Sequence, residues 1–374
     1  MKNLLITGGA GFIGSNLCET AFDQGYSVTI LDNLSPQIHG NWENSFLYKK
    51  IKGKCNFIKG DVCNRKDWQI ALENADAVIH LAAETGTGQS MYQVEHYYKV
   101  NVLGTAILVD LLINEHHQVR KIIVASSRAV YGEGKYLSKA FGVQYPSARN
   151  IEDMQEGLFD LLDAGGDAMQ PLATDESSAL HPISAYGLTK LAQEQMIMTM
   201  AKQTNIPAVA LRFQNVYGPG QSLNNPYTGL LAVFANRIRN GSALDVYEDG
   251  NESRDFVYIS DAVNAIMLSL NGEANDYTFN VGSGAATSIL AVARLMSKYF
   301  NTAPEIKISN RFRVGDIRHN YADLSLVSER IGYKPKISFE RGLKNFVDWV
   351  LSQQPVSDRY DESVKEIITR GLMK

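Results

Sequence analysis

The sequence predicts an α/β protein: a doubly wound parallel sheet with a smaller, mixed domain after it. Short β-branched, apolar runs alternate with helical stretches through the first half; the runs lie at 4–7, 27–31, 56–58, 77–81 and 122–125. Near-continuous apolar runs are typical of strands that are buried on both faces of a parallel sheet. Helical periodicity fills the gaps between them, and repeated strand–helix units of this kind predict a doubly wound sheet.

The domain boundary is predicted from the point where this regularity ends. Residues 208–212 form a sixth apolar run, and the patterning becomes irregular beyond it. We therefore predict a first domain over 1–212, to which 256–282 returns, and a second domain over the remainder of 213–374.

A long connection, 133–174, separates the fifth strand from the next clear helix. Connections longer than ~15 residues usually act as lids or carry structure of their own. A peripheral insertion without chemistry remains the alternative.

Composition excludes several classes of protein. The chain has 374 residues and a net charge of −4, which gives no sign of a nucleic-acid-binding surface. Its three cysteines form no CxxC pair, so neither a disulfide framework nor a metal site is expected. No apolar run approaches the ~20 residues that span a bilayer. A strand is predicted from Asn3, which leaves no room for a signal peptide, and we expect a cytoplasmic protein.

A glycine-rich turn stands between the first strand and the first helix. The segment Thr7–Gly14 reads T-G-G-A-G-F-I-G. Glycines here permit a tight turn, close approach of a pyrophosphate and close packing of helix on strand, while the helix N-terminus offers free N–H groups. Asp32 ends the second strand, where a carboxylate binds both ribose hydroxyls and repels a 2′-phosphate. The pattern predicts a Rossmann domain that binds NAD rather than NADP; a glycine-rich turn in another α/β fold is the alternative.

Residues after the third and fourth strands extend this site. Asp61 and Val62 stand where an adenine edge is met, and Leu81-Ala82-Ala83 are small enough to let a dinucleotide cross the sheet edge. The expected cofactor-binding residues in this half are Gly8, Gly11, Phe12, Ile13, Gly14, Asp32, Asn33, Asp61, Val62, Leu81, Ala82 and Ala83.

A candidate catalytic set lies further along the chain. Tyr186 and Lys190 are spaced i, i+4 on one helical face. Free tyrosine titrates near ~10. A neighbouring lysine and a positive nicotinamide favour the tyrosinate, so Tyr186 can act as a base. Lys190 can also hold the nicotinamide ribose. Ser127 ends the fifth strand, where it can share a hydrogen bond with the reacting oxygen; a strand-end cap is its alternative role.

Together these motifs resemble the extended short-chain dehydrogenases, in the branch of NAD-dependent sugar-nucleotide epimerases and dehydratases. The resemblance runs from about residue 2 to 350 and also includes His80-Leu81-Ala82-Ala83, Asn101, Val130-Tyr131-Gly132, 211–219, 254–257 and 313–316. The closest likeness is to members that act as dTDP-L-rhamnose 4-epimerases or UDP-glucose 4-epimerases.

The resemblance implies roles for individual residues. On the cofactor side it implies Asn101, Tyr186, Lys190 and Phe213, with Phe213 near the nicotinamide. On the substrate side it implies Thr87, Ser127, Asn215, Leu231, Tyr247, Arg254 and Arg313. Within that set, Asn215 and the two arginines would bind the diphosphate, Thr87 the sugar, and Leu231 and Tyr247 the base. The guanidinium fork suits phosphate, although a surface ion pair is the alternative for each arginine.

One departure from the family pattern bears on the reaction. The 4,6-dehydratases carry Asp-Glu directly after the catalytic Ser/Thr position, whereas this chain has Arg128 and Ala129 there. This favours 4-epimerisation of a nucleotide sugar, with NAD remaining bound. A reductase, a dehydratase, a decarboxylase and a C2-epimerase on the same scaffold stay open, as does a non-catalytic NAD-binding regulator.

The resemblance also implies an oligomeric state. Members commonly dimerise through the helix that carries Tyr186 and the helix before the fifth strand, so we expect a homodimer. The apolar run at 196–200 is compatible with an interface or with the core.

Overall fold

The centre of the protein is a seven-stranded parallel sheet with the order β14-β9-β5-β4-β1-β2-β3. The computed structural model describes all of residues 1–374 except 224, 226 and 228. The sheet strands are β1 (Asn3–Thr7), β2 (Ser27–Asp32), β3 (Asn56–Lys59), β4 (Ala77–His80), β5 (Lys121–Ser127), β9 (Ala208–Phe213) and β14 (Tyr277–Val281). The order reverses at β1, which makes the sheet doubly wound as predicted. The segment expected to return from the second half contains β14, which pairs with β9.

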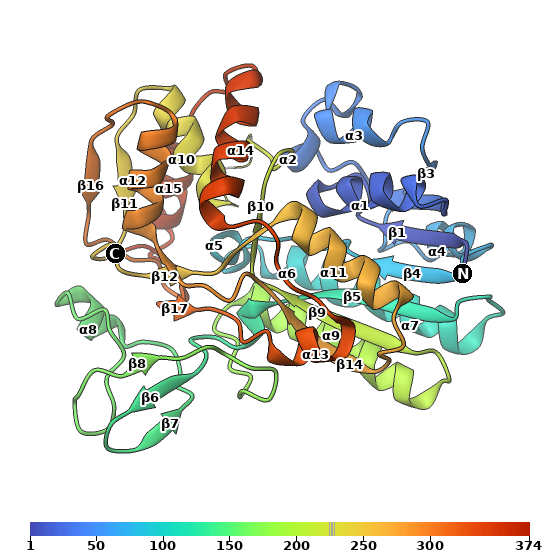
Figure 1. Cartoon of the computed structure of the whole chain (residues 1–374), viewed down its shortest axis with the longest axis horizontal. Helices are drawn as coiled ribbons and strands as arrows, with labels where there is room; N and C mark the ends of the chain where they lie inside the picture. Colours follow the sequence, from blue (N-terminus) through green and yellow to red (C-terminus); the bar gives the residue numbers. More distant parts are fainter. Residues whose placement is uncertain (224, 226, 228) are drawn as a thin grey trace.

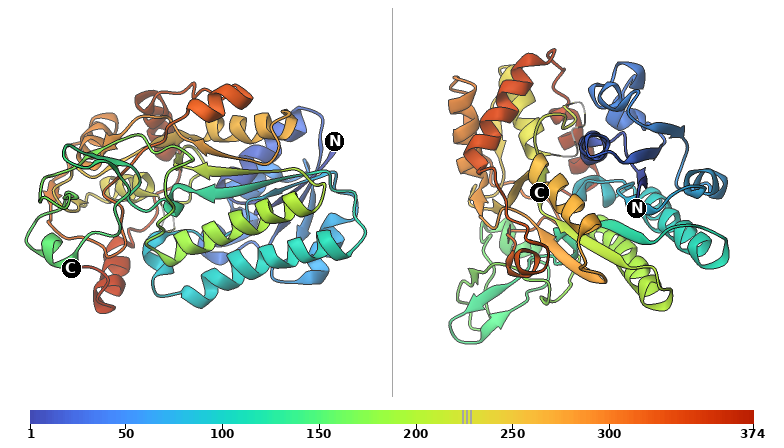
Figure 2. Two further views of the ribbon diagram at one scale, coloured as in Figure 1. Left: turned by 90° about the horizontal axis from the view of Figure 1, so that it is seen from below. Right: turned by 45° about the vertical axis from the view of Figure 1, so that its right-hand side comes forward.

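Helices cover both faces of this sheet (Figures 1 and 2). On one face lie α1 (Phe12–Asp23), α11 (Ile259–Asn271) and α13 (Ser325–Ile331). On the other lie α4 (Arg65–Leu72), α7 (Gly104–Asn114) and α9 (Ala185–Gln203). Side chains alternate along a strand. Leu4 and Ile6 of β1 therefore pack against the helices α1 and α11, and Leu5 packs against α4, α7 and α9 on the other face. Burial on both faces explains why the strands are apolar almost throughout.

Short elements connect these layers at the rim of the sheet. They are α2 (Pro36–His39), η1 (Trp42–Asn44), α3 (Phe46–Ile51), α5 (Thr87–Ser90), α6 (Val94–Tyr97), η2 (Tyr98–Leu103) and η3 (Arg128–Val130).

The second half of the chain builds a smaller unit beyond the carboxyl ends of the strands (Figure 1). Its elements are β10 (Asn215–Tyr217), α10 (Leu230–Arg239), β11 (Leu244–Val246), β12 (Ser253–Arg254), β13 (Phe256–Tyr258), β15 (Thr287–Ser288), α12 (Ile289–Tyr299), β16 (Ile306–Ile308), β17 (His319–Asn320), α14 (Phe339–Ser352) and α15 (Tyr360–Thr369). The strands form small sheets of two or three strands, and a separate apolar core includes side chains of α10, α12 and α14. The α/β class with a smaller mixed unit agrees with the prediction.

The connection 133–174 carries structure of its own. It contains β6 (Tyr136–Ser138), β7 (Gly142–Gln144), α8 (Ile151–Gln155) and β8 (Gln170–Pro171). The three strands form an antiparallel sheet that projects from the lower left of Figure 1.

Buried ion pairs join this insertion to the second unit. Arg149 of the insertion bonds Glu133 at 3.1 Å and Glu248 at 2.8 Å. Glu248 also accepts from Arg318 at 2.8 Å, and Arg318 reaches back to Asp160 of the insertion at 2.9 Å. The side chains of Arg149, Glu133 and Glu248 are almost wholly buried. The insertion is therefore fixed to the protein by charge pairing, in addition to the apolar contact of Phe159 with Phe312.

Arg149→Met should destabilise the protein strongly because it leaves two buried carboxylates without their shared cation. We expect the free energy of unfolding to fall by about 3–5 kcal/mol, measured by urea denaturation. The control is Arg120→Met, which removes an exposed arginine paired with Asp76 and should change it by less than about 1 kcal/mol. Equal effects of the two substitutions would contradict this account of the insertion.

Candidate active site

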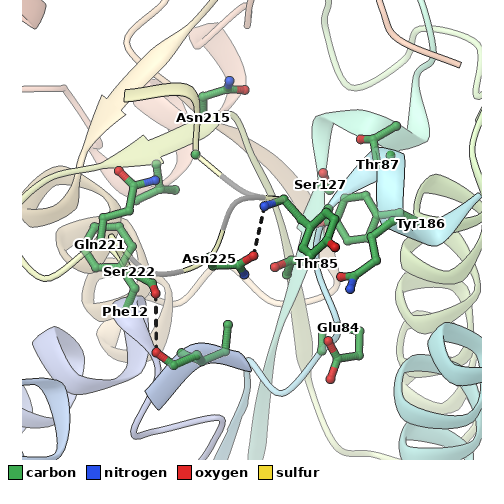
Figure 3. A pocket seen from close by; sticks show the side chains of 18 of the residues that line it. Phe12, Glu84, Thr85, Thr87, Ser127, Tyr186, Asn215, Gln221, Ser222 and Asn225 are labelled. Atoms are coloured by element: carbon green, nitrogen blue, oxygen red, sulfur yellow. Dashed lines mark hydrogen bonds between the residues drawn. The ribbon is translucent and has the colours of Figure 1, made fainter. Parts of the chain in front are cut away.

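A cavity of about 580 Å³ lies at the carboxyl ends of the central strands, between the sheet and the second unit. Its walls include the glycine turn after β1, the residues that follow β4 and β5, the start of α9, and parts of α10 and α15. Figure 3 shows side chains that face it from both halves of the chain. Ligands of doubly wound sheets bind at this edge, where the strand order reverses.

The turn after β1 is built by close backbone approaches that only glycine allows. A Cβ atom on Gly8, whose φ is +66°, would lie 2.9 Å from the backbone of Ala82. A Cβ atom on Gly14 would lie 2.4 Å from the carbonyl oxygen of Gly8. These contacts bring the N-terminus of α1 against the sheet edge and leave backbone N–H groups for a pyrophosphate.

Asp32 is held at the end of β2 by two backbone donors. Its Oδ2 accepts from the N–H of Ala10 at 2.9 Å and its Oδ1 from that of Leu34 at 2.8 Å. Burial raises the pKa of Asp32, and the two N–H groups oppose this rise. Each carboxylate oxygen keeps further acceptor capacity, so this oriented carboxylate fits the ribose hydroxyls of NAD.

Most of the predicted cofactor-binding residues line the cavity. They are Gly8, Gly11, Phe12, Ile13, Gly14, Asp32, Asn33, Val62, Leu81, Ala82, Ala83, Tyr186, Lys190 and Phe213.

Two residues predicted to contact the cofactor, Asp61 and Asn101, are not among those that line the cavity, and their contacts with the cofactor stay a prediction. Asp61 is turned into its own loop, where Oδ1 accepts from the N–H of Cys63 at 2.8 Å. Asn101 is fully buried and binds both backbone groups of Glu84 as well as the Thr189 hydroxyl. Asn101 therefore supports a segment that lines the cavity.

Ser127 and Tyr186 are brought together by the packing of α9 against the segment after β5 (Figure 3). A Cβ atom on Gly187 would lie 2.6 Å from the carbonyl oxygen of Ala129, so the two backbones are nearly in contact. Ser184 caps the helix by accepting from the N–H of Gly187 at 3.1 Å. This fixes the first turn of α9, from which Tyr186 reaches the cavity.

Several groups act on the pKa of Tyr186. Burial raises it, while the Ser127 hydroxyl and the charge of Arg128 oppose the rise. Burial also lowers the pKa of Lys190 to about 7, and its Nζ donates to Gln193 Oε1 at 2.7 Å. Arg128 is thus a cation near the phenol that the sequence prediction did not include, and the effect of Lys190 together with a bound nicotinamide stays a prediction.

The predicted substrate residues also converge on the cavity, with one exception. Thr87, Ser127, Asn215, Tyr247, Arg254 and Arg313 line it. Leu231 does not: it is 1% exposed and packs in the core of the second unit, and its contact with the base stays a prediction. The neighbouring Leu230 faces the cavity instead, because successive residues of a helix point about 100° apart.

Sequence reasoning missed one wall of the cavity altogether. Tyr360, Ser363, Val364 and Ile367 of α15 line it. Tyr360 donates to Asp245 at 2.7 Å and lies 2.7 Å from the hydroxyl of Tyr247. The chain end is fixed beside 312–314, where Phe312 and Lys374 exchange backbone hydrogen bonds. No local motif marks this helix, since its place depends on tertiary packing.

Within the described part of the chain, no group of three or more His, Cys, Asp or Glu side chains could hold a metal ion. No helix among the described residues is long and apolar enough to cross a membrane.

The fold and the site define a Rossmann-type, dinucleotide-binding protein whose cavity is lined by Ser127, Tyr186 and Lys190. The model of the NAD dependent epimerase/dehydratase family matches residues 4–149 and 158–282, and the chain belongs to this family. NAD is its cofactor.

The chain is similar to several known epimerases along nearly its whole length. A dTDP-L-rhamnose 4-epimerase of Burkholderia thailandensis is 39% identical over 355 residues, which cover 94% of this chain and 96% of the relative. A solved UDP-N-acetylglucosamine 4-epimerase of Methanobrevibacter ruminantium is 30% identical, with a TM-score of 0.75 over 94% of this chain and 99% of its own. A UDP-glucuronic acid 4-epimerase of Bacillus cereus, solved with UDP-glucuronic acid and NAD, is 25% identical, with a TM-score of 0.74 over 93% and 99%.

Glu252 in the cavity wall should give the protein a specific pH dependence. Burial raises the pKa of Glu252 to about 7, and its Oε2 has no hydrogen-bond partner among the described residues. A carboxyl whose pKa is raised by folding contributes stability below pH 4.5 that is lost as the pH rises through 7. Glu252→Gln should therefore match the wild type in stability near pH 5 and exceed it near pH 8, by on the order of 1–3 kcal/mol.

Thermal unfolding at both pH values measures this difference. Glu340→Gln, on the exposed first turn of α14, is the control and should show no such growth. If the difference in stability between Glu252→Gln and the wild type does not grow with pH, the Glu252 carboxyl group does not have a raised pKa in the folded protein.

Proposed function

We propose that this protein is an NAD-dependent nucleotide-sugar 4-epimerase that acts on a dTDP- or UDP-hexose. The observation that carries the proposal is the cavity wall directly after Ser127. There Arg128 and Ala129 face the site beside Tyr186 and provide no carboxyl group. An Asp-Glu pair at this place would allow loss of water; its replacement favours oxidation and reduction at C4 alone.

The β1–α1 turn and Asp32 would hold NAD, which when bound would supply a reversible hydride acceptor for C4 of the sugar. Tyr186 would remove the proton from O4 as the hydride departs and give it back as the hydride returns. The Ser127 hydroxyl, which lines the cavity beside the phenol, would share the same oxygen. Holding base and cofactor around one cavity makes both steps effectively unimolecular.

The two ends of the cavity suit the two ends of such a substrate. Arg254 and Arg313 lie on the side of the second unit, where their guanidinium groups would bind the diphosphate. Tyr247 and Tyr360 stand at the same side and offer aromatic surface to a base. The relatives support this assignment, because dTDP-L-rhamnose and UDP-sugar 4-epimerases match the chain almost from end to end.

A panel of nucleotide sugars tests the proposal directly. Purified protein with NAD should interconvert one C4-epimeric pair among dTDP-, UDP-, CDP- and GDP-hexoses, identified by NMR, without net change in absorbance of NADH. Stoichiometric gain or loss of NADH would indicate a dehydrogenase or reductase, and a product inverted at C2 would indicate the other epimerase type. No turnover of any member would favour a non-catalytic NAD-binding protein.

Tyr186→Phe tests the assigned base. The substitution keeps the ring and removes the phenolic proton acceptor, so kcat should fall by about 10²- to 10⁴-fold while NAD binding stays unchanged. Tyr98→Phe, at a half-exposed position outside the cavity wall, is the matched control and should leave kcat unaltered. Wild-type turnover by the Tyr186 variant would show that another group moves the proton.

A further inference from the structure

Three arginines line the cavity, and two of them have hydrogen-bond partners at a terminal guanidinium nitrogen. Arg313 is paired with Asp316 at 2.7 Å. Arg254 donates through Nη1 to the carbonyl oxygens of Ser253 and Arg318, at 2.8 and 3.0 Å.

Arg128 is in a different condition. Its Nε donates to Asn215 Oδ1 at 2.7 Å, and its Nη1 is buried without a hydrogen-bond partner among the described residues. Burial, together with the charge of Arg254, lowers the pKa of Arg128 to about 9. Asp316, the carboxylate with the largest opposing effect on Arg128, is already paired with Arg313.

A guanidinium nitrogen buried without an acceptor is costly to a fold unless the site is built for an anion. Arg128 follows Ser127 in the chain, and both residues line the cavity. The charged groups that act on Arg128 include Tyr186, Arg254 and Asp316, which line the same cavity. Arg128 is therefore near both the proposed base and an arginine proposed to bind the diphosphate.

The bond to Asn215 fixes a second donor beside it. An arginine side chain has no acceptor, so the Asn215 oxygen must face Arg128 and its NH₂ group must face elsewhere. Asn215 and Arg128 both line the cavity, so the Asn215 amide protons and the Nη1 protons of Arg128 are two donor groups on neighbouring, hydrogen-bonded side chains.

We propose that Arg128 is a substrate-binding residue whose guanidinium, together with the Asn215 amide, holds the sugar-proximal phosphate of the nucleoside diphosphate. This deepens the proposed function and rests on it. The contact would fix the distance from the diphosphate to Tyr186, and hence which sugar carbon meets the base. Arg128, which stands where a dehydratase has an acidic residue, would thus provide a positive charge opposite the substrate's diphosphate.

Calorimetric titration separates this role from catalysis. We would titrate the NAD-loaded wild type with dTDP, dTMP, UDP and UMP, because only the diphosphates carry the phosphate in question. The wild type should bind at least one diphosphate more tightly than the matching monophosphate. Arg128→Met should lower the affinity for that diphosphate by about 10- to 100-fold. It should leave the affinity for the monophosphate within about twofold of the wild-type value. Arg128→Lys, which keeps the charge without the fork, should lose less.

Arg239→Met is the matched control, since Arg239 binds two backbone carbonyls away from the cavity wall and should alter no nucleotide affinity. The melting temperature separates this role from a structural one. Without nucleotide, Arg128→Met should melt no lower than the wild type, because it removes a nitrogen that is buried without an acceptor. A residue needed for the fold would lower the melting temperature when replaced.

Three results would overturn the proposal: equal wild-type affinity for diphosphate and monophosphate, equal weakening of both by Arg128→Met, or a diphosphate affinity unchanged in both Arg128 variants. The titrations need no turnover. A protein that fails the nucleotide-sugar panel but shows the expected contrast would refute the 4-epimerase proposal and keep the phosphate contact.

Discussion

The site depends on how closely the backbone of the β1–α1 turn approaches its neighbours. At Gly8 and Gly14 a single added carbon would lie within 3 Å of backbone atoms, so the sheet edge and the start of α1 have almost no space between them. That contact turns the N–H groups of the turn toward the cavity and lets Ala10 orient Asp32. The NAD site is therefore a consequence of local chain geometry, which is why a short motif is enough to reveal it.

The same kind of contact, at Gly187, makes the other half of the site. It presses α9 against the segment after β5, and so places Tyr186 beside Ser127 and Arg128. Three influences then act on the pKa of Tyr186: burial raises it, while the Ser127 hydroxyl and the charge of Arg128 oppose the rise. Arg128 itself is hydrogen-bonded to Asn215 and has no ion-pair partner among the described residues. The residue pair after Ser127 thus bears both on the type of reaction and on how the substrate is held.

The sequence was informative wherever structure follows from neighbouring residues. The sheet, the glycine turn, Asp32 and the Tyr186–Lys190 spacing all follow from local periodicity or local motifs. Local patterns say less where the answer depends on packing: Leu231 is buried in the core of the second unit while its neighbour Leu230 lines the cavity, and Asn101 is buried beside Glu84, which it binds. The part played by α15 and the unpaired state of Arg128 depend on which distant groups come to lie beside them, and neither has a local signal.

Retention of the C4 hydrogen tests the central claim most directly. We propose that one hydride leaves C4 of a nucleotide sugar and returns to the same carbon within the closed site. With dTDP-L-rhamnose deuterated at C4, or the corresponding labelled form of whichever sugar the protein converts, the account predicts that NMR finds the label at C4 of the inverted product, with no uptake of solvent hydrogen at any ring carbon. Loss of the C4 label, or incorporation of solvent hydrogen at C2, C3 or C5, would contradict it.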